Sequence, residues 1–189
     1  KALHEMYPTA PIYCLYRNKR FTDEFFPGAN IVSSIKHQAS NYKWLLPFFP
    51  SMIESIDLSD YDLVISTGSI FSKGLVLRPR TYHINYCHSP TRQVWDLSHL
   101  TLHDTRYALH KKMFQHFFRI WDRQASTRVD KYIANSEHVR ARIKKYYRRD
   151  AEVIYPPVTP PAPLILRGEK FMPSPLKQGG LRGLVVSRL

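Results

Sequence analysis

The stretch KYIANSEHVRARIKKYYRRDAEVIY, residues 131–155, contains a strand, a helix and a second strand in immediate succession. The runs KYIA and EVIY are short, continuous and apolar, which favours strands covered on both faces. Between them, Ser136 is a typical helix N-cap, and Val139, Ile143 and Tyr146 share one face of the helix that follows. A strand that leads through a helix into another strand predicts a parallel βαβ unit.

The sequence before this unit continues the same alternation. Four apolar runs are predicted as strands, at residues 10–16, 30–33, 61–66 and 82–87. A long helix is expected at residues 104–127, with one apolar stripe formed by Tyr107, Phe114, Phe117, Phe118, Trp121 and Ala125. We therefore predict an α/β fold: a Rossmann-like parallel sheet with helices on both faces.

The character of the sequence changes after this α/β region. Residues 1–157 are expected to form one domain, and residues 158–181 a linker, because seven prolines fall between residues 156 and 175. The apolar run GLVVSRL at residues 183–189 predicts one more strand. Since a single strand cannot form a sheet, residues 182–189 are expected to begin a second domain that is cut short.

The composition limits the class of protein and of partner. The chain has 189 residues, is 43% hydrophobic and carries a formal charge of +13, so it has material for a core and attracts anions. Nucleic acid, nucleotides and an anionic membrane face all fit that charge. The two cysteines do not form a disulfide framework, which favours a reducing compartment, and no apolar run is long enough for a membrane-spanning helix.

Polar residues follow three of the predicted strands. In open α/β sheets, ligands bind beyond the carboxyl ends of the strands, so these turns are the candidate site. The second turn contains His88, and the third contains Asn135 and Ser136. The first turn lacks the glycine spacing of a nucleophile elbow, which argues against a hydrolase. That first turn consists of Ser66, Thr67, Gly68 and Ser69.

Five segments carry a resemblance to a known family: DLVISTGS, HINYCHSPTRQVWD, WDRQASTRVDKYIANSEHVRARIKKYY, AEVIYPPV and LVVSRL. In this order and spacing they resemble the amino-terminal half of a family 4 glycosyltransferase of the two-domain GT-B type. The similar family members are bacterial enzymes that build polysaccharide or lipopolysaccharide. The resemblance covers roughly residues 60–158 and the last few residues.

The resemblance implies a retaining transfer from a nucleotide-sugar, such as GDP-mannose or a UDP-sugar, with no metal ion and no cofactor. The donor would lie between two Rossmann-like domains, and residues 182–189 would begin the donor-binding one. By position in the motifs, His88 would be the catalytic residue at the donor sugar and Arg188 would contact the diphosphate. Asn135 and Ser136 would add donor contacts through a helix start. The acceptor side would comprise Ser66, Thr67, Gly68, Ser69, Lys73 and Arg92.

The chain also departs from the family pattern. The glycine-rich turn after the family's first strand is absent, as are the lysine and paired glutamates of its second domain. Thr159 stands where an aspartate usually follows the IYPPV motif. The chain alone is therefore expected to be inactive.

Most candidate residues have a plainer interpretation. His88 could be a strand-end histidine bonded to a neighbouring carbonyl, and Lys73 and Arg92 could be solvated surface cations. Trp95 and Asp96 are expected to be structural.

Two further motifs bear on this region. Ser89 and Pro90 are expected to cap a helix and to occupy its first position. His99 and His103 could share a metal but have no third ligand of suitable spacing.

The basic helices suggest a location and two alternative functions. Their cations favour docking to an anionic inner membrane, where a lipid-linked or oligosaccharide acceptor would lie. The protein would then be cytoplasmic and peripheral, with no nucleic-acid partner. The alternatives are a non-catalytic RNA- or membrane-binding module and a sugar-nucleotide epimerase of the same architecture.

Overall fold

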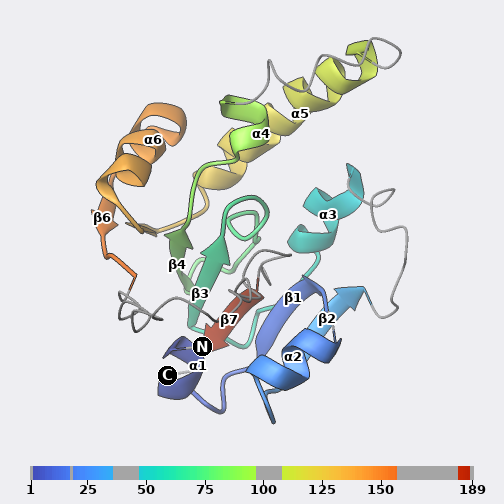
Figure 1. The fold of residues 1–189 in the computed structure, drawn as a ribbon, viewed down its shortest axis with the longest axis vertical. Coiled ribbons are helices and arrows are strands. Elements are labelled where there is room, and N and C mark those ends of the chain that lie inside the picture. The colour runs from blue at the N-terminus through green and yellow to red at the C-terminus, as the bar shows by residue number, and fades with distance from the viewer. Residues whose placement is uncertain (1, 18, 36–46, 97–107, 157–182, 188–189) are drawn as a thin grey trace, which may run out of the picture.

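A computed structural model describes residues 2–17, 19–35, 47–96, 108–156 and 183–187. Its centre is a seven-stranded sheet in the order β2-β1-β7-β3-β4-β5-β6 (Figure 1). The strands are β1 (Ile12–Tyr16), β2 (Ile31–Ile35), β3 (Leu63–Gly68), β4 (Tyr82–Cys87), β5 (Lys131–Ala134), β6 (Ala151–Val153) and β7 (Gly183–Ser187).

The predicted parallel α/β sheet is confirmed, with one strand that differs. β1 pairs in parallel with β2, and β3 to β6 form a continuous parallel run. β7 lies between β1 and β3 and is antiparallel to both, with Val185 opposite Ile12 on one side and Ile65 on the other. The end of the described chain therefore joins the two parallel parts of the sheet. The assignment of residues 182–189 to a donor-binding domain stays a prediction.

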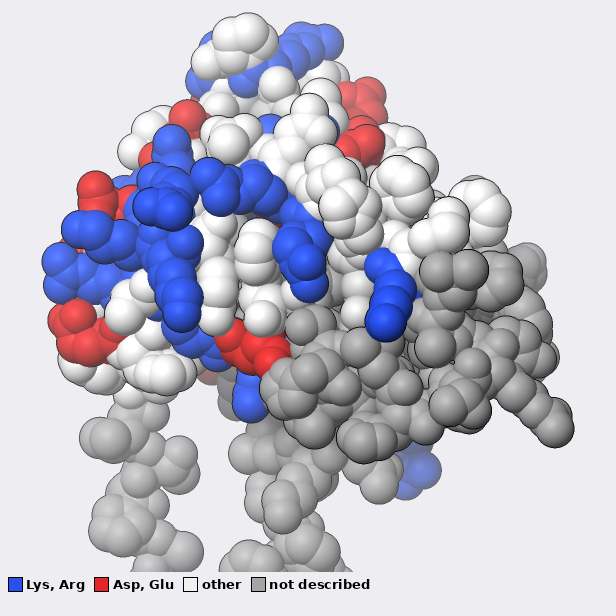
Figure 2. Space-filling view, turned by 90° about the horizontal axis from the view of Figure 1, so that it is seen from above, with Lys and Arg blue, Asp and Glu red and all other residues white. Residues whose placement is uncertain are grey.

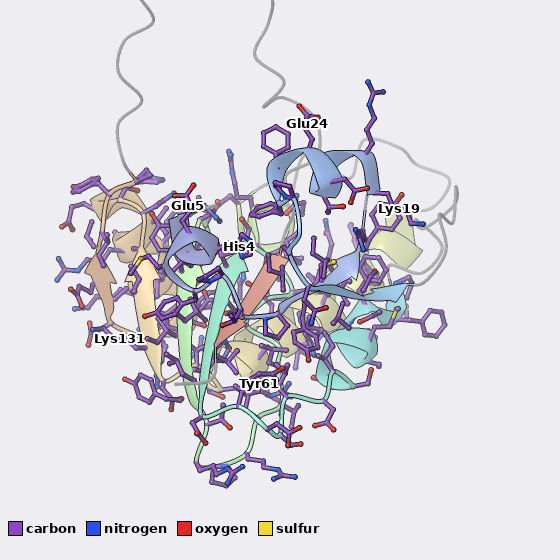
Figure 3. All side chains as sticks on the ribbon, turned by 90° about the horizontal axis from the view of Figure 1, so that it is seen from below. His4, Glu5, Lys19, Glu24, Tyr61 and Lys131 are labelled. Carbon is purple, nitrogen blue, oxygen red and sulfur yellow. The ribbon has the colours of Figure 1, made fainter. Side chains whose placement is uncertain are left out.

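Six helices accompany the sheet in the described residues: α1 (Ala2–Met6), α2 (Lys19–Phe25), α3 (Phe49–Glu54), α4 (Arg92–Trp95), α5 (Ala108–Ser126) and α6 (Glu137–Tyr147). Figure 1 shows α1 and α2 on the side of the sheet away from α3, α5 and α6. Figure 3, seen from that side, shows both acidic and basic side chains there, including Glu5 on α1 and Lys19 and Glu24 on α2. Helices therefore occupy both faces, as predicted.

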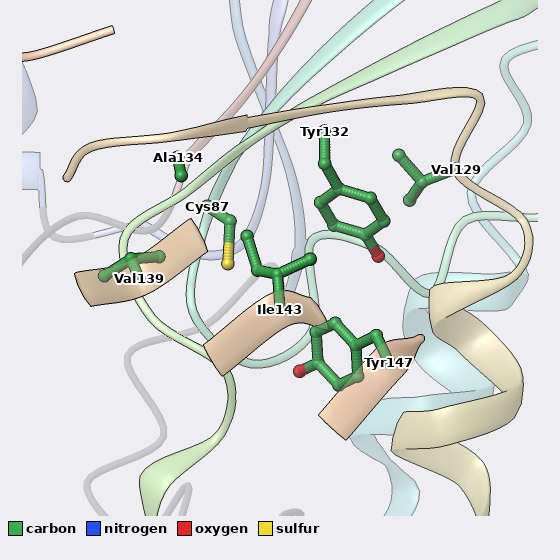
Figure 4. Packing of buried hydrophobic residues seen from close by; sticks show 7 residues of the cluster. All are labelled: Cys87, Val129, Tyr132, Ala134, Val139, Ile143 and Tyr147. Carbon is green, nitrogen blue, oxygen red and sulfur yellow. The ribbon is translucent and has the colours of Figure 1, made fainter. Parts of the chain in front are cut away.

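The core beneath α6 comes from alternate residues of the strands. Cys87 of β4 and Tyr132 and Ala134 of β5 point to one face and pack against Ile143 and Tyr147 of α6 (Figure 4). Strand side chains alternate between faces and helix residues three or four apart share a face, so these residues meet in one layer. Val139 and Ile143 are buried as predicted, but the third buried residue of this helix is Tyr147, whereas Tyr146 is only partly buried.

A second cluster lies under α3 and α5. Ile53, Leu58, Val64 and Leu75 form its buried centre, and Trp121 of α5 packs against it. None of the described helices is long and apolar enough to cross a membrane.

The observed bounds of the strands agree closely with the bounds predicted from the sequence. β4 and β5 coincide with their predicted ranges, and the bounds of β1, β2, β3 and β6 differ from prediction by at most two residues. The long helix is observed at Ala108–Ser126, and residues 104–107 lie outside the described chain. Its predicted single apolar stripe is wrong in part, because Phe114 and Phe117 are exposed.

Candidate functional site

Three polar turns meet at one edge of the sheet, as the sequence predicts. β3, β4 and β5 are adjacent and parallel, and their last residues are in register: Gly68 lies opposite Cys87, and Cys87 opposite Ala134. The turns that follow these strands therefore emerge side by side. We call this edge the rim.

His88 is exposed at the centre of the rim. Its Nε2 lies 3.0 Å from the Thr67 hydroxyl, and its backbone N–H donates to the Gly68 carbonyl at 3.2 Å. The ring also meets Tyr86 edge-on, with 5.4 Å between centroids. Contacts with the end of β3 thus fix an imidazole that still reaches solvent.

Gly68 ends β3 in a backbone conformation that suits glycine. Its φ of 150° is strained for residues that carry a Cβ. The chain then turns so that the Ser69 carbonyl lies 3.3 Å from the Thr91 hydroxyl. This contact brings the first turn of the rim against the second.

Asn135 and Ser136 form the third turn and begin α6. The Ser136 hydroxyl oxygen accepts from the Val139 amide at 3.3 Å, which confirms Ser136 as the N-cap, and its proton is directed to Asn135 Oδ1 at 3.2 Å. The start of a helix carries partial positive charge and unpaired amides. α6 therefore presents an anion-attracting end at the rim.

Ser66 does not lie at the rim, contrary to its predicted acceptor contact. Its side chain is fully buried, and its hydroxyl lies 2.7 Å from His83 Nε2 and 2.7 Å from Asn85 Nδ2. Asn85 Nδ2 also donates to Ser72 at 3.2 Å. Since Ser66 alternates with Thr67 along β3, only Thr67 faces the rim. Burial lowers the pKa of His83 to about 4, which keeps this ring neutral at pH 7.

Lys73 is also internal and not a surface cation. It is 3% exposed, and its ammonium group donates to the Ile70 carbonyl at 2.6 Å. It pairs with the fully buried Asp122 of α5 at 2.6 Å. The predicted acceptor contact by Lys73 is therefore wrong as a direct contact, because the carboxylate inside the protein already neutralises this charge.

Asp122 connects the turns beneath the rim. Its Oδ1 accepts from the Thr91 hydroxyl at 2.7 Å and its Oδ2 from Trp95 Nε1 at 2.7 Å. We call Lys73, Asp122, Thr91 and Trp95 the Asp122 cluster. Through Ile70 it holds the segment after β3, and through Thr91 and Trp95 it holds the segment after His88.

Sequence reasoning missed Asp122, although a signal was present. Asp122 lies within the apolar pattern that Phe118, Trp121 and Ala125 form on α5. A carboxylate within such a pattern faces the interior and therefore needs a buried cationic or hydrogen-bonding partner.

The helix after His88 begins later than predicted. α4 is preceded by Thr91 as N-cap, whereas the Ser89 hydroxyl donates to the Pro90 carbonyl at 2.9 Å. The hydroxyl of Thr91 donates to Asp122, so α4 has no side-chain cap. Arg92 is exposed at the first position of α4, four residues after His88, and its predicted acceptor contact stays a prediction.

Asp96 and Trp95 have the structural roles that were predicted for them. Asp96 accepts from the Tyr146 hydroxyl at 2.5 Å and pairs with Arg142. The Trp95 ring stacks on Tyr146 with centroids 5.0 Å apart. These contacts join α4 to α6.

Cys87 precedes His88 but is no candidate nucleophile. It is almost fully buried, and burial raises the pKa of its thiol to about 11. The thiol therefore remains protonated at neutral pH, and a thiol is a weak nucleophile.

The remaining predicted residues lie outside the described chain. These are Arg188 and the pair His99 and His103. Among the residues that are described, no group of three His, Cys, Asp or Glu side chains could hold a metal ion.

Comparison with known proteins gives one match. A family model described as Glycosyltransferase Family 4 matches residues 9–160, which is well over half of the chain and includes all three turns of the rim. No curated protein and no solved structure matches the chain.

Proposed function

Because this chain belongs to glycosyltransferase family 4, we propose that it forms the acceptor-side half of a retaining enzyme that transfers a sugar from a nucleotide-sugar. The observation that carries this proposal is the rim. An exposed imidazole, an exposed arginine and a helix start lie together at the carboxyl ends of three parallel strands. Family membership favours glycosyl transfer over the binding-module and epimerase alternatives.

In the proposed reaction, the bond between the anomeric carbon and the diphosphate oxygen breaks. A bond to the acceptor oxygen forms on the same face of the sugar, and the acceptor proton leaves with the diphosphate. Positive charge develops on the sugar and negative charge on the leaving group. Preorganised donors and dipoles stabilise such charges best, because they need no reorganisation during the reaction.

His88 is proposed to donate a hydrogen bond to a hydroxyl of the donor sugar. Its bonds to Thr67 and Gly68 orient the ring before the substrate arrives. The start of α6 at Asn135 and Ser136 is proposed to face the diphosphate, since helix N-termini attract anionic groups. Arg188 is proposed to add a cation there.

The acceptor is proposed to be lipid-linked, with Thr67, Ser69 and Arg92 on its side of the rim. Arg92 is exposed and could pair with an acceptor phosphate. Such an acceptor would bring the enzyme to the anionic inner leaflet, where each basic residue near the surface contributes about 1 kcal/mol. GDP-mannose or a UDP-sugar is the proposed donor.

The test is sugar transfer by membranes of cells that express the gene encoding this chain. Incubation with radiolabelled GDP-mannose or UDP-sugars should label the lipid extract. His88→Ala should lower this transfer by about 100-fold or more, since loss of one preorganised donor has an effect of that order. His138→Ala is the matched control, because His138 is an exposed histidine at the second position of α6 and the substitution removes its side chain but keeps the backbone amide of the helix start.

Three results separate the parts of the proposal. Equal transfer by the His88→Ala and His138→Ala proteins would remove His88 from the site. No transfer by the wild-type protein from any sugar-nucleotide would refute the proposed function. A loss with His88→Ala that is accompanied by a lower melting temperature would instead indicate a structural role for His88.

A further inference from the structure

Exposed apolar side chains gather on one helix. Of the eleven large hydrophobic residues that are exposed in the described chain, four lie on α5 and the others are spread over separate elements and loops. The four are Met113, Phe114, Phe117 and Ile120. Isolated exposed hydrophobics are normal on protein surfaces, but a contiguous set indicates an interaction site.

Three of these residues share one line along the helix. Met113, Phe117 and Ile120 follow the spacing i, i+4, i+7, which places them on the same face of α5. Their exposures are 52%, 62% and 52%. We call them the outer stripe. Phe114 differs, because its ring stacks on the buried Phe118 with centroids 5.7 Å apart.

The outer stripe points away from the protein core. α5 packs on the protein core through Phe118, Trp121 and Ala125. Arg119 and Arg123, on a different side from the outer stripe, contact α4 and the end of α6. Figure 1 shows the amino-terminal half of α5 extending beyond the sheet. An outward apolar line on a helix that already has a packed inner face is available for a partner.

A line of basic residues runs beside the outer stripe. Lys112, Arg119 and Arg123 are spaced seven and four apart, so they share a neighbouring face of α5. No carboxylate of the described residues pairs with them. Arg119 donates to the carbonyl of Val94, and Arg123 to that of Tyr146. These carbonyl contacts orient the guanidinium groups without cancelling their charge.

The positive surface continues onto α6. Arg140, Lys144, Lys145 and Arg148 are all exposed there. Figure 2, which looks onto the side that carries α4, α5 and α6, shows Lys and Arg gathered over α6 beside a surface of uncharged residues. α5 and α6 meet where Arg123 donates to the Tyr146 carbonyl, so the cations of both helices lie on the same side of the sheet.

We infer that the outer stripe of α5 inserts into the interface of an anionic lipid bilayer, with the adjacent cations on the lipid headgroups. A helix with an apolar line and a basic flank is typical of segments that lie in the membrane plane. A second copy of this chain fits less well, because it would bring like charges together. A nucleic acid would use the cations but leave the phenylalanine and isoleucine side chains in water. The structural argument for membrane binding does not use the proposed function. Only the reason for binding, access to a lipid-linked acceptor, rests on that proposal.

The inference is tested by sedimentation of the purified chain with vesicles. Phosphatidylcholine vesicles with and without phosphatidylglycerol are the probes. The wild-type chain should bind the anionic vesicles and lose that binding in high salt. The double variant Phe117→Glu/Ile120→Glu should bind at least about tenfold more weakly, because two apolar side chains no longer leave water.

Two further variants identify which property matters. Val76→Glu is the matched control, since Val76 is 53% exposed outside α5 and should leave binding nearly unchanged. Lys112→Gln/Arg123→Gln should weaken binding to anionic vesicles by about fivefold for each charge removed. All of these positions are exposed, and circular dichroism with a thermal melt checks that each variant folds.

Two outcomes would overturn the inference, and two more separate it from the proposed function. Equal binding by wild-type protein and the Phe117→Glu/Ile120→Glu variant would exclude the outer stripe as the docking surface. A dimer in sedimentation velocity that this variant dissociates would assign the stripe to a second copy instead. If the wild-type chain does not bind vesicles but sugar is still transferred to a detergent-solubilised lipid extract, the membrane inference is refuted and the proposed function stands. Vesicle binding without any transfer would refute only the function.

Discussion

Phe117 and Phe118 are neighbours on α5, yet the first is 62% exposed and the second 8%. Phe118 belongs to the inner face, where Trp121 stacks on it and Asp122 is buried one turn further along. Phe117 belongs to the outer stripe and contacts no core cluster of the described residues. One helix thus carries two apolar faces, one that packs in the core and one that is exposed to solvent. The inner one stabilises the fold beneath the rim, and the outer one is free to bind.

The largest effect is expected at the ionic centre of the inner face. Asp122→Asn should lower the free energy of unfolding by about 3–5 kcal/mol, because it leaves the Lys73 ammonium group buried without a counter-charge. Asp62→Asn, which removes an exposed partner of Arg80, is the control and should change stability by less than about 0.5 kcal/mol. Urea denaturation measures both. Similar midpoints for the two variants would show that Asp122 does not hold the rim turns.

The two neighbouring phenylalanines test the comparison directly. Phe118→Ala should lower the free energy of unfolding by about 3 kcal/mol, because it removes a ring packed between Phe71 and Trp121. Phe117→Ala should change it by less than about 0.5 kcal/mol. Equal losses in chemical denaturation would mean that the outer stripe is part of the core.

A pH dependence should come from the strand beneath the inner face. The pKa of His83 is lowered from 6.5 to about 4 by burial, so the folded state resists protonation that the unfolded state accepts. Stability should therefore fall as the pH drops through the window from 6.5 to about 4. At about 1.4 kcal/mol for each pKa unit, the loss is on the order of 3 kcal/mol.

The variant His83→Gln isolates this contribution, since glutamine does not titrate. Urea denaturation at a series of pH values should give a shallower decline for the variant than for the wild-type protein. Parallel declines would place the acid sensitivity in other groups.

The smallest effect expected concerns the fit of Trp121 on the inner face. A Cβ on Gly74 would lie 2.5 Å from Trp121 Cζ2, and the indole is held by a hydrogen bond to Glu54 at 2.9 Å. Gly74→Ala should therefore cost about 1–3 kcal/mol and change the near-ultraviolet circular dichroism of the tryptophans. Gly28→Ala is the control: its φ of +78° strains the backbone, but no atom lies within 4 Å of the added carbon. An unchanged aromatic spectrum in Gly74→Ala would contradict tight packing there.

Sequence reasoning succeeded where a local pattern decides the outcome. The strand–helix alternation predicted the parallel sheet, and parallel neighbouring strands necessarily bring His88 and Ser136 to one edge. It was wrong at Ser66 and Lys73, which are both buried. A continuous apolar strand does not reveal which alternate residues face the rim, and a lysine in a turn is usually solvated. Lys73 can be buried because Asp122, on a helix distant in the sequence, neutralises its charge.

The position of β7 is a second case that sequence did not predict. The run GLVVS predicts a strand, but strands pair through backbone groups that every residue shares. The side chains of this run therefore do not predict that it pairs with β1 and β3, or that it is antiparallel to them.

By itself, the sequence determined the strands, the helices α5 and α6, the parallel pairing of β3 to β6, and the edge of the sheet at which His88 lies. Those features follow from hydrophobic periodicity, capping residues and the geometry of βαβ units, which act within a few tens of residues. Only the tertiary structure decided that Lys73 pairs with Asp122 inside the protein and that Phe117 faces outward while Phe118 faces inward. Burial depends on what packs from elsewhere in the chain, and that information is not local.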